Sequence, residues 1–213
     1  MKELPYWNHN TAYYKWIARR TAGCGSILDV GCGDGSLARY LDDGTGTIVG
    51  IDPDEECVRR ARQFPCSPSV SFLRCSFEDY APERLFGAVV FSASLHHMEM
   101  EGALRKASDL LSPGGRLLVV GLAKPSSPAD RLVEILRVMP SGLLSLLHRM
   151  KTTEEAGIPV SYDFPEMRAV RTAAERILPG AQPRYGLHYR YLLEWKKPGA
   201  PAPLCERKGG VRE

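Results

Sequence analysis

No stretch of this 213-residue sequence is long and apolar enough to cross a bilayer, and neither sign of charge dominates. Uninterrupted apolar runs such as Leu117–Val120 fall far short of the roughly 20 residues that span a membrane. The opening segment MKELPYWNHN lacks the apolar core of a secretory signal peptide, which favours a cytoplasmic protein. With 28 basic and 25 acidic residues the formal net charge is +3, too balanced to indicate binding to nucleic acid or to an anionic membrane.

The six cysteines lack the spacing of metal and redox sites. No two of them are separated by two residues, so there is no Cys-x-x-Cys motif, and we predict no metal site. Because no export signal is present, free thiols in a reducing compartment are a simpler interpretation than disulfides. The cysteines stand at positions 24, 32, 57, 66, 75 and 205.

The composition, 44% hydrophobic and 25% charged, is that of one soluble globular domain. We expect the domain to span residues 1–197 and to begin with an aromatic-rich helix within residues 1–22. Residues 198–213 combine proline, glycine and charge without periodicity, and they are expected to form a disordered tail.

Between residues 27 and 121, short apolar runs alternate with segments of helical periodicity. The runs are apolar throughout rather than alternating, which indicates strands that are covered on both faces. This pattern predicts an α/β fold, a doubly wound and mostly parallel sheet with helices on each side. The strands are predicted at 27–30, 48–51, 70–73, 88–91 and 116–120, with helices over 37–41, 57–64 and 103–111.

The alternation of short apolar runs and helical segments ends after residue 121. Residues 122–163 contain four prolines among leucine-rich pieces and predict one or two short inserted helices. A clear apolar stripe predicts a helix over 167–178, ended by Pro179 and Gly180. Apolar and polar residues then alternate over 185–195, which predicts one half-buried antiparallel strand.

The sharpest local motif is ILDVGCGDG at 27–35, a strand that runs into closely spaced glycines and then into a helix. Glycines allow a tight turn and a close approach of a ligand to the backbone. A dinucleotide fingerprint would place Gly or Ala where Ser36 stands, and a P-loop would contain a lysine. Carboxylates at Asp29 and Asp34 would repel a pyrophosphate but suit a ligand that carries an ammonium and a sulfonium.

Asp52 ends the second predicted strand. At that position an acidic side chain can accept hydrogen bonds from both hydroxyls of a ribose. The alternative is that Asp52 caps a helix whose first turn contains Pro53.

Four motifs in this order resemble the class I S-adenosylmethionine-dependent methyltransferases. They are LDVGCGDG (28–35), VGIDPD (49–54), FSASLHHM (91–98) and LSPGGRLLVV (111–120). The resemblance covers about residues 25–121. It implies a seven-stranded Rossmann-like methyltransferase fold whose last strand pair is antiparallel, with S-adenosylmethionine as cofactor.

The resemblance also implies a binding residue for each part of the cofactor. The glycine turn, Gly31, Cys32 and Gly33, would lie against the methionine end, with Asp29 near its ammonium. Ser92 would line the floor under the sulfonium.

At the other end of the cofactor, Asp52 would hold the ribose and Pro53 would neighbour the adenine. Ser76 and Phe77 would border the adenine ring. Many family members carry Asp where Cys75 stands in this sequence, which leaves open the residue that recognises the adenine amino group.

Missing motifs narrow the function to methyl transfer onto a small molecule. No Asn/Asp-Pro-Pro-aromatic motif follows the fourth strand, which argues against methylation of bases in nucleic acid. The insert 122–163 lies where the family builds a substrate lid, and its leucines favour an apolar or aromatic acceptor. A dimer contact and ordinary core packing are the alternatives for those leucines, and the protein is expected to be a monomer or a homodimer.

Methyl transfer is an in-line displacement that needs no metal, because the sulfonium already activates the methyl carbon. An oxygen or carbon acceptor must also lose a proton, and His97, just past the fourth strand, is our candidate base ahead of His96 and His9. The acceptor atom, O, N or C, stays open. The alternatives are an RNA or protein methyltransferase and a non-catalytic module that binds S-adenosylmethionine.

Overall fold

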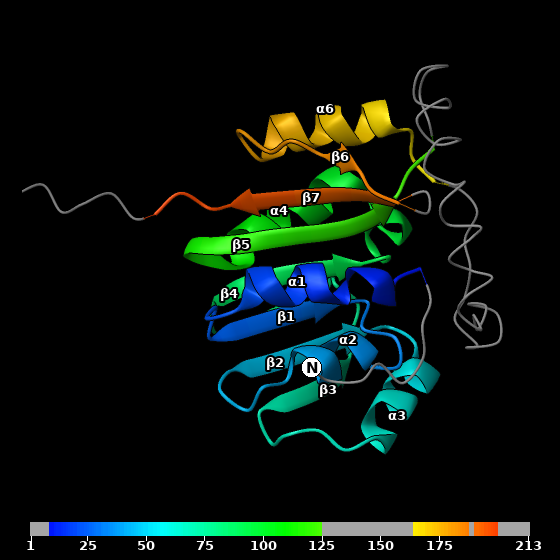
Figure 1. The fold of residues 1–213 in the computed structure, drawn as a ribbon, viewed down its shortest axis with the longest axis vertical. Helices are drawn as coiled ribbons and strands as arrows, with labels where there is room; N and C mark the ends of the chain where they lie inside the picture. The colour runs from blue at the N-terminus through cyan, green and yellow to red at the C-terminus, as the bar shows by residue number, and fades with distance from the viewer. Residues whose placement is uncertain (1–8, 125–163, 188–189, 200–213) are drawn as a thin grey trace, which may run out of the picture.

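The computed structural model describes residues 9–124, 164–187 and 190–199. Its centre is a seven-stranded sheet in the order β3-β2-β1-β4-β5-β7-β6, so the expected mostly parallel sheet is confirmed (Figure 1). The strands are β1 (Ser26–Val30), β2 (Thr47–Asp52), β3 (Val70–Arg74), β4 (Phe86–Ser92), β5 (Leu111–Leu122), β6 (Arg184–Tyr185) and β7 (Arg190–Lys196). The helices are the 3-10 turns η1 (Thr11–Tyr13) and η2 (Leu95–His97) and the α-helices α1 (Tyr14–Thr21), α2 (Ser36–Leu41), α3 (Glu55–Gln63), α4 (Met100–Leu110) and α6 (Met167–Ile177).

The order of the strands reverses beside β1. Strand β1 pairs in parallel with β2 on one side and with β4 on the other, and β3 and β5 extend the sheet outwards. Strand β7 runs antiparallel to both β5 and β6. In such sheets the connections leave β1 in opposite directions, which opens a crevice at the carboxyl ends of the central strands.

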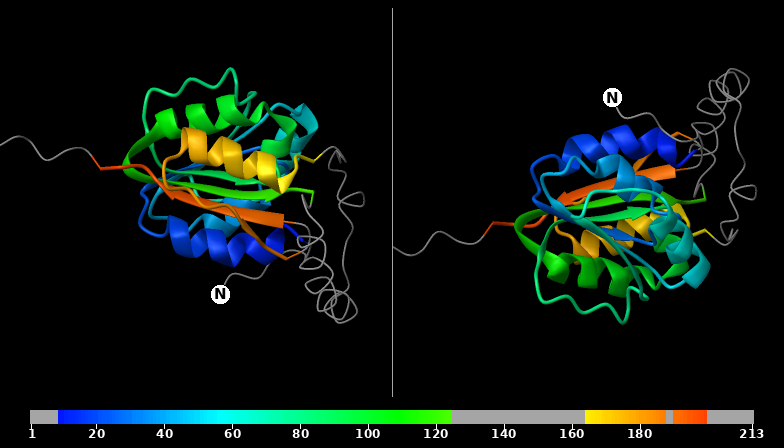
Figure 2. Two further views of the ribbon diagram at one scale, coloured as in Figure 1. Left: turned by 90° about the horizontal axis from the view of Figure 1, so that it is seen from above. Right: turned by 90° about the horizontal axis from the view of Figure 1, so that it is seen from below.

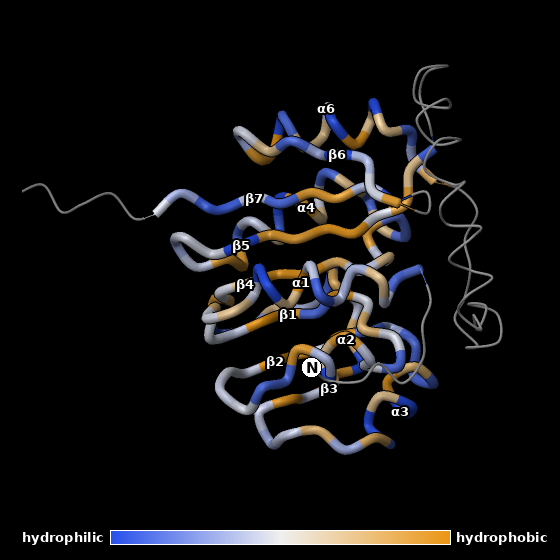
Figure 3. Tube along the Cα trace, viewed as in Figure 1, coloured by the Kyte–Doolittle hydropathy of each residue, from blue (hydrophilic) through white to orange (hydrophobic). Residues whose placement is uncertain are grey.

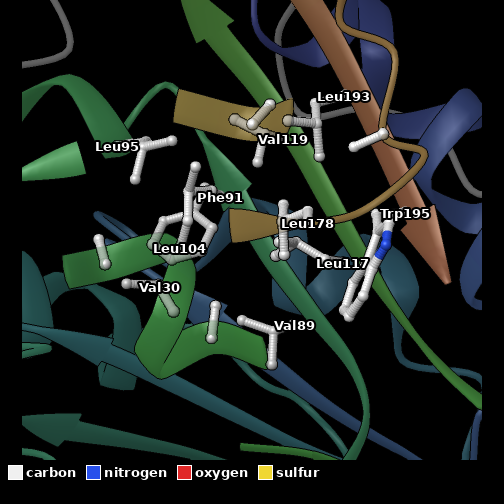
Figure 4. Close-up of a cluster of buried hydrophobic side chains, with 14 of the residues drawn as sticks. Val30, Val89, Phe91, Leu95, Leu104, Leu117, Val119, Leu178, Leu193 and Trp195 are labelled. Carbon is white, nitrogen blue, oxygen red and sulfur yellow. The ribbon is translucent and has the colours of Figure 1, made fainter. Parts of the chain in front are cut away.

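Helices cover both faces of the sheet (Figure 2). Helices α1, α2 and α3 share one core with the strands, and α4 and α6 share the other. The central strands carry hydrophobic residues, as Figure 3 shows, because helices bury these strands from both sides. Figure 4 shows the second core, where Phe91 and Leu104 pack among side chains that are fully buried.

Three local expectations were wrong. Pro53 lies before α3 rather than in its first turn, since Asp54 caps that helix by accepting from the N–H groups of Glu56 and Cys57. Helix α4 ends at Leu110 and β5 begins at the next residue, so the Pro-Gly-Gly segment lies within the strand.

The third difference concerns the half-buried pattern expected over 185–195, whereas the antiparallel strand pair is as expected. The segment forms β6 and β7, which are antiparallel to each other. Strand β7 is buried at most positions rather than at every second one, because it lies inside the sheet between β5 and β6 and helices cover both faces.

Several expectations concern residues outside the described ranges. Residues 1–8, 125–163 and 200–213 contain the start of the aromatic segment, nearly all of the insert and most of the tail. In the described part of the chain, Lys124 N donates to Pro165 O at 2.8 Å and Met167 N to Lys124 O at 3.0 Å, so the two ends of the insert meet. No helix within the described ranges is long and apolar enough to span a membrane.

Candidate active site

A cavity of about 350 Å³ opens at the carboxyl ends of β1, β2 and β4, where the strand order reverses. Its volume lies within the range of small-molecule and cofactor sites. The glycine turn after β1, the acidic end of β2 and the loop after β4 line it. The lining residues are Asn10, Tyr14, Asp29, Gly31, Cys32, Gly33, Asp34, Leu37, Asp52, Pro53, Asp54, Cys57, Ser92, Ala93, Ser94, His97 and Met98.

Hydrogen bonds to β2 and close packing against the loop after β4 fix the glycine turn. The backbone N–H groups of Gly31 and Cys32 both donate to the carbonyl of Ile51, at 2.9 and 3.0 Å. Gly31 has φ +70°, and a Cβ atom there would lie 2.5 Å from the Cβ of Ser94, so only glycine fits. Gly33, at φ +54°, has open space where a Cβ would stand, which leaves its backbone exposed to a ligand in the cavity.

Asp52 connects the end of β2 to the glycine turn. Its Oδ2 accepts from the N–H of Gly33 and its Oδ1 from the N–H of Asp54, each at 2.9 Å. The expected alternative, Asp52 as helix cap, is wrong, because Asp54 caps α3. Each carboxylate oxygen of Asp52 retains acceptor capacity beyond its one backbone bond, which suits the paired hydroxyls of a ribose.

Asp29 lines the same cavity from inside β1. Its side chain is 1% exposed, and within the described part of the chain neither carboxylate oxygen has a hydrogen-bond partner. Burial first, and then the charges of Asp52 and Asp34, raise the pKa of Asp29 to about 7. The burial of an ionised carboxylate without a partner costs free energy, and a cationic ligand such as an ammonium would offset that cost.

The loop after β4 forms a further part of the cavity lining. Ala93 has φ +59°, a left-handed conformation that is strained for a non-glycine residue, and its N–H donates to the carbonyl of Val120 at 2.7 Å. The hydroxyl of Ser94 donates to the carbonyl of Val30 and so ties this loop to β1. His97 then lines the cavity at the end of η2.

His96 is not among the residues that line the cavity. Its ring lies 4.1 Å from that of His97 and meets Phe164 edge-on, with the ring centres 5.3 Å apart. Burial, followed by the neighbouring charges of His97 and Arg190, lowers the pKa of His96 to about 4. His96 is therefore neutral at physiological pH.

Most residues predicted from the sequence meet at this cavity. They are Asp29, Gly31, Cys32, Gly33, Asp52, Pro53, Ser92 and His97. Ser76 and Phe77 are not among its lining residues. Phe77 is 2% exposed and packs edge-on against Phe91, and the hydroxyl of Ser76 donates to Asp79.

Sequence reasoning missed other residues of the lining. Cys57 belongs to no motif and reaches the cavity only through the packing of α3, whereas Ser94 lies within the FSASLHHM motif but was not named individually. Asn10 precedes η1 without a side-chain cap bond, and its Oδ1 accepts from Arg190 at 2.5 Å.

Comparison with known proteins agrees with this geometry. A family model described as a methyltransferase domain matches residues 27–115. An uncharacterized methyltransferase of Mycobacterium bovis is 32% identical over 196 residues, which cover 90% of this chain and 98% of that protein. The human mitochondrial ubiquinone biosynthesis O-methyltransferase is 33% identical over 109 residues, 46% of this chain and 29% of that protein.

A solved structure shares the whole architecture. Magnesium protoporphyrin IX methyltransferase from Synechocystis PCC 6803, with bound S-adenosylhomocysteine, matches with a TM-score of 0.57 over 88% of this chain and 81% of that one, at 15% identity. The fold and the cavity thus define a Rossmann-like methyltransferase. The chain belongs to the family of class I S-adenosylmethionine-dependent methyltransferases.

Proposed function

We propose that this methyltransferase transfers the methyl group in line to a small-molecule acceptor, with the donor held by the glycine turn, Asp29 and Asp52. The observation that carries the proposal is the way the N-terminal segment borders the cavity. Asn10 and Tyr14 line one side, and the nearby Tyr13 hydroxyl donates to the carbonyl of Leu187 at 2.7 Å. A cavity bordered in this way suits a small acceptor better than the broad surface of a macromolecule.

S-adenosylmethionine, when bound, supplies a methyl group on a positively charged sulfur. In this proposal the unpartnered carboxylate of Asp29 accepts from the ammonium of the donor, next to the turn formed by Gly31, Cys32 and Gly33. Ser92 lines the floor below the reacting carbon.

Asp52 holds the ribose, and Pro53 borders the adenine. Cys57 lines the same part of the cavity as Pro53 and is a further neighbour for the base. Ser76 and Phe77 lie outside the cavity lining, so their predicted contact with adenine has no support in this arrangement.

His97 is the base that we propose for an oxygen or carbon acceptor. It lines the cavity at the end of η2, shortly after β4. A neutral imidazole there can take the proton that the acceptor loses as the new bond to the methyl carbon forms. The remaining task of the chain is to align the acceptor and to exclude water.

The relatives' names support a small acceptor without deciding it. One matched protein acts in ubiquinone biosynthesis as an O-methyltransferase, and another is a ribosomal protein L11 methyltransferase. Methylation of protein or RNA is therefore the alternative function. The near-neutral charge favours neither nucleic acid nor an acidic surface as partner.

The experiment that tests the proposal is the incubation of the purified protein with tritiated S-adenosylmethionine and an extract of its source cells. Ultrafiltration then separates small molecules from macromolecules. We expect label in the small-molecule filtrate with the wild-type protein and much less with Asp52→Ala at a donor concentration near the wild-type dissociation constant. Label that appears only in protein or RNA would contradict a small acceptor.

A further inference from the structure

A buried arginine, Arg190, bonds to a residue of the cavity lining without lining the cavity itself, and the mechanism above does not use it. Arg190 is the first residue of β7 and is paired with Leu122 at the last position of β5, on the edge of the sheet where the cavity opens. It is 9% exposed. Arginine is rarely so buried in a folded protein unless an anion accompanies it.

The described part of the chain supplies no such anion. The Nη2 of Arg190 donates to the Oδ1 of Asn10 at 2.5 Å, and its Nε has no partner. None of the ion pairs among the described residues includes Arg190. Burial lowers its pKa to about 10, which still leaves the guanidinium charged. One neutral amide is poor compensation for a desolvated cation, so the site is suited to a negative ligand.

Two contacts relate Arg190 to the acceptor side of the cavity. Asn10, which accepts its hydrogen bond, lines the cavity itself. The charge of Arg190 also contributes to the lowered pKa of His96, whose ring adjoins that of His97. The guanidinium therefore lies close to both Asn10 and the histidine pair.

The acidic side chains line the cavity, whereas Arg190 lies outside the lining and bonds to Asn10 within it. Four carboxylates, those of Asp29, Asp34, Asp52 and Asp54, line the cavity at the ends of β1 and β2. An anionic acceptor would be repelled there and attracted towards Arg190. The planar guanidinium can bind both oxygens of a carboxylate through parallel hydrogen bonds.

We propose that Arg190 binds a carboxylate of the methyl acceptor, so that the substrates of this enzyme are organic acids. This inference rests on the proposed small-molecule function and gives the chemical class of its substrate. Arg190 acts as a specificity residue, because it recognises the charge of the acceptor. It also holds Asn10, and that structural role alone would not distinguish an acid from a neutral analogue of the same shape.

The test uses pairs of probes that differ only in charge. Benzoate and benzamide, cinnamate and cinnamamide, and octanoate and octanamide are titrated by NMR into the full-length protein saturated with S-adenosylhomocysteine. We expect the acid of at least one pair to bind about 10-fold or more tightly than its amide, as a charge-assisted hydrogen bond implies. Equal binding of acid and amide in every pair, or no binding of any acid, would overturn the inference.

Three variants connect the preference to the guanidinium. Arg190→Gln should abolish the preference for the acid, and Arg190→Lys should reduce it because the lysine lacks the two-pronged donor. Arg184→Gln makes the same charge change on the exposed neighbouring strand β6 and should keep the preference. Unchanged S-adenosylhomocysteine affinity verifies that each variant is folded.

Asn10→Ala separates recognition from positioning. This variant keeps the guanidinium, so it should retain the acid preference, and a loss as complete as in Arg190→Gln would overturn the inference. Failure of the proposed function is a different result, namely label confined to macromolecules in the extract experiment. Small-molecule methylation without an acid preference that depends on Arg190 would overturn this inference alone.

Discussion

The carboxylate of Asp52 and the backbone of Gly33 are joined by a hydrogen bond of 2.9 Å between Oδ2 and N. The bond connects the end of β2 to the turn after β1, and the second oxygen of Asp52 accepts from Asp54 N. The carboxylate is thus held in one orientation before any ligand binds. The same residue that is proposed to hold the ribose also shapes the turn proposed to hold the methionine end.

Asp52→Ala should weaken the binding of S-adenosylhomocysteine by about 1.5–3 kcal/mol, the contribution of a charge-assisted hydrogen bond. Calorimetric titration measures this loss directly. Asp43→Ala, which removes an exposed carboxylate that accepts from the backbone and the hydroxyl of Thr45, is the matched control and should bind as the wild type does. Equal affinities of the Asp52 variant and the wild type would mean that the ribose lies elsewhere.

Gly33→Ala should fold but lose donor binding. Gly33 and Gly25 both have positive φ and open space at the Cβ position, so alanine at either costs a similar backbone strain of about 1–2 kcal/mol. Only Gly33 lines the cavity, where the new methyl group would occupy the space of the ligand. Thermal melts should therefore shift alike in Gly33→Ala and Gly25→Ala, while titration should show binding in Gly25→Ala alone. Tight binding by Gly33→Ala would contradict the placement of the donor.

Asp29→Asn should stabilise the protein freed of donor, yet weaken donor binding. The pKa of Asp29 is about 7 in the folded state, well above the value of about 3.9 for an unperturbed aspartate. The folded state therefore holds the proton more tightly, and stability falls as pH rises between these two values. Removal of the carboxylate should increase the free energy of unfolding by a few kcal/mol at about pH 8 and by little at about pH 4. Urea unfolding at both pH values measures it, and a less stable variant at the higher pH would refute the argument.

Donor affinity should depend on pH through the same residue. An ammonium binds the ionised form of Asp29, so below a pH of about 7 the bound cation must displace a proton. The dissociation constant of S-adenosylhomocysteine should rise up to about 10-fold for each pH unit below that value. Calorimetry across this range should show a proton released on binding, and Asp29→Asn should remove the dependence. A flat profile in the wild type would show that Asp29 does not meet the ammonium.

His97→Gln should lower kcat by about 10²- to 10⁴-fold for an oxygen or carbon acceptor, the usual loss of a general base. His96→Gln is the control, because that ring is adjacent but outside the cavity lining. Initial rates with the acceptor found in the extract measure both. If the His97 variant retains full kcat, the base is another group or the acceptor needs none.

The sequence predicted the sheet, and most of the residues that it predicted for the donor lie at one cavity, because both depend on local patterns. Gly31, Gly33 and Asp52 occupy fixed positions at the ends of successive strands, and parallel strands bring those ends together. The inward direction of Phe77 was not predictable, since a two-residue motif after β3 does not indicate which way a side chain points.

The sequence did not predict the residues that we propose for the acceptor, and the reason is different. Arg190 and Asn10 are distant along the chain and meet only because β7 is inserted antiparallel beside β5. An arginine at the start of a strand has no sequence feature that separates it from exposed arginines such as Arg184. Its burial is a property of the assembled fold alone.

The central claim is that one cavity holds the donor with its ammonium on Asp29 and its ribose on Asp52. A crystal structure with bound S-adenosylhomocysteine tests it most directly. The account predicts the amino group within hydrogen-bond distance of the Asp29 carboxylate, the ribose hydroxyls on Asp52, and the sulfur facing His97 across the cavity. An amino group directed away from Asp29, or a ligand bound outside this cavity, would contradict it.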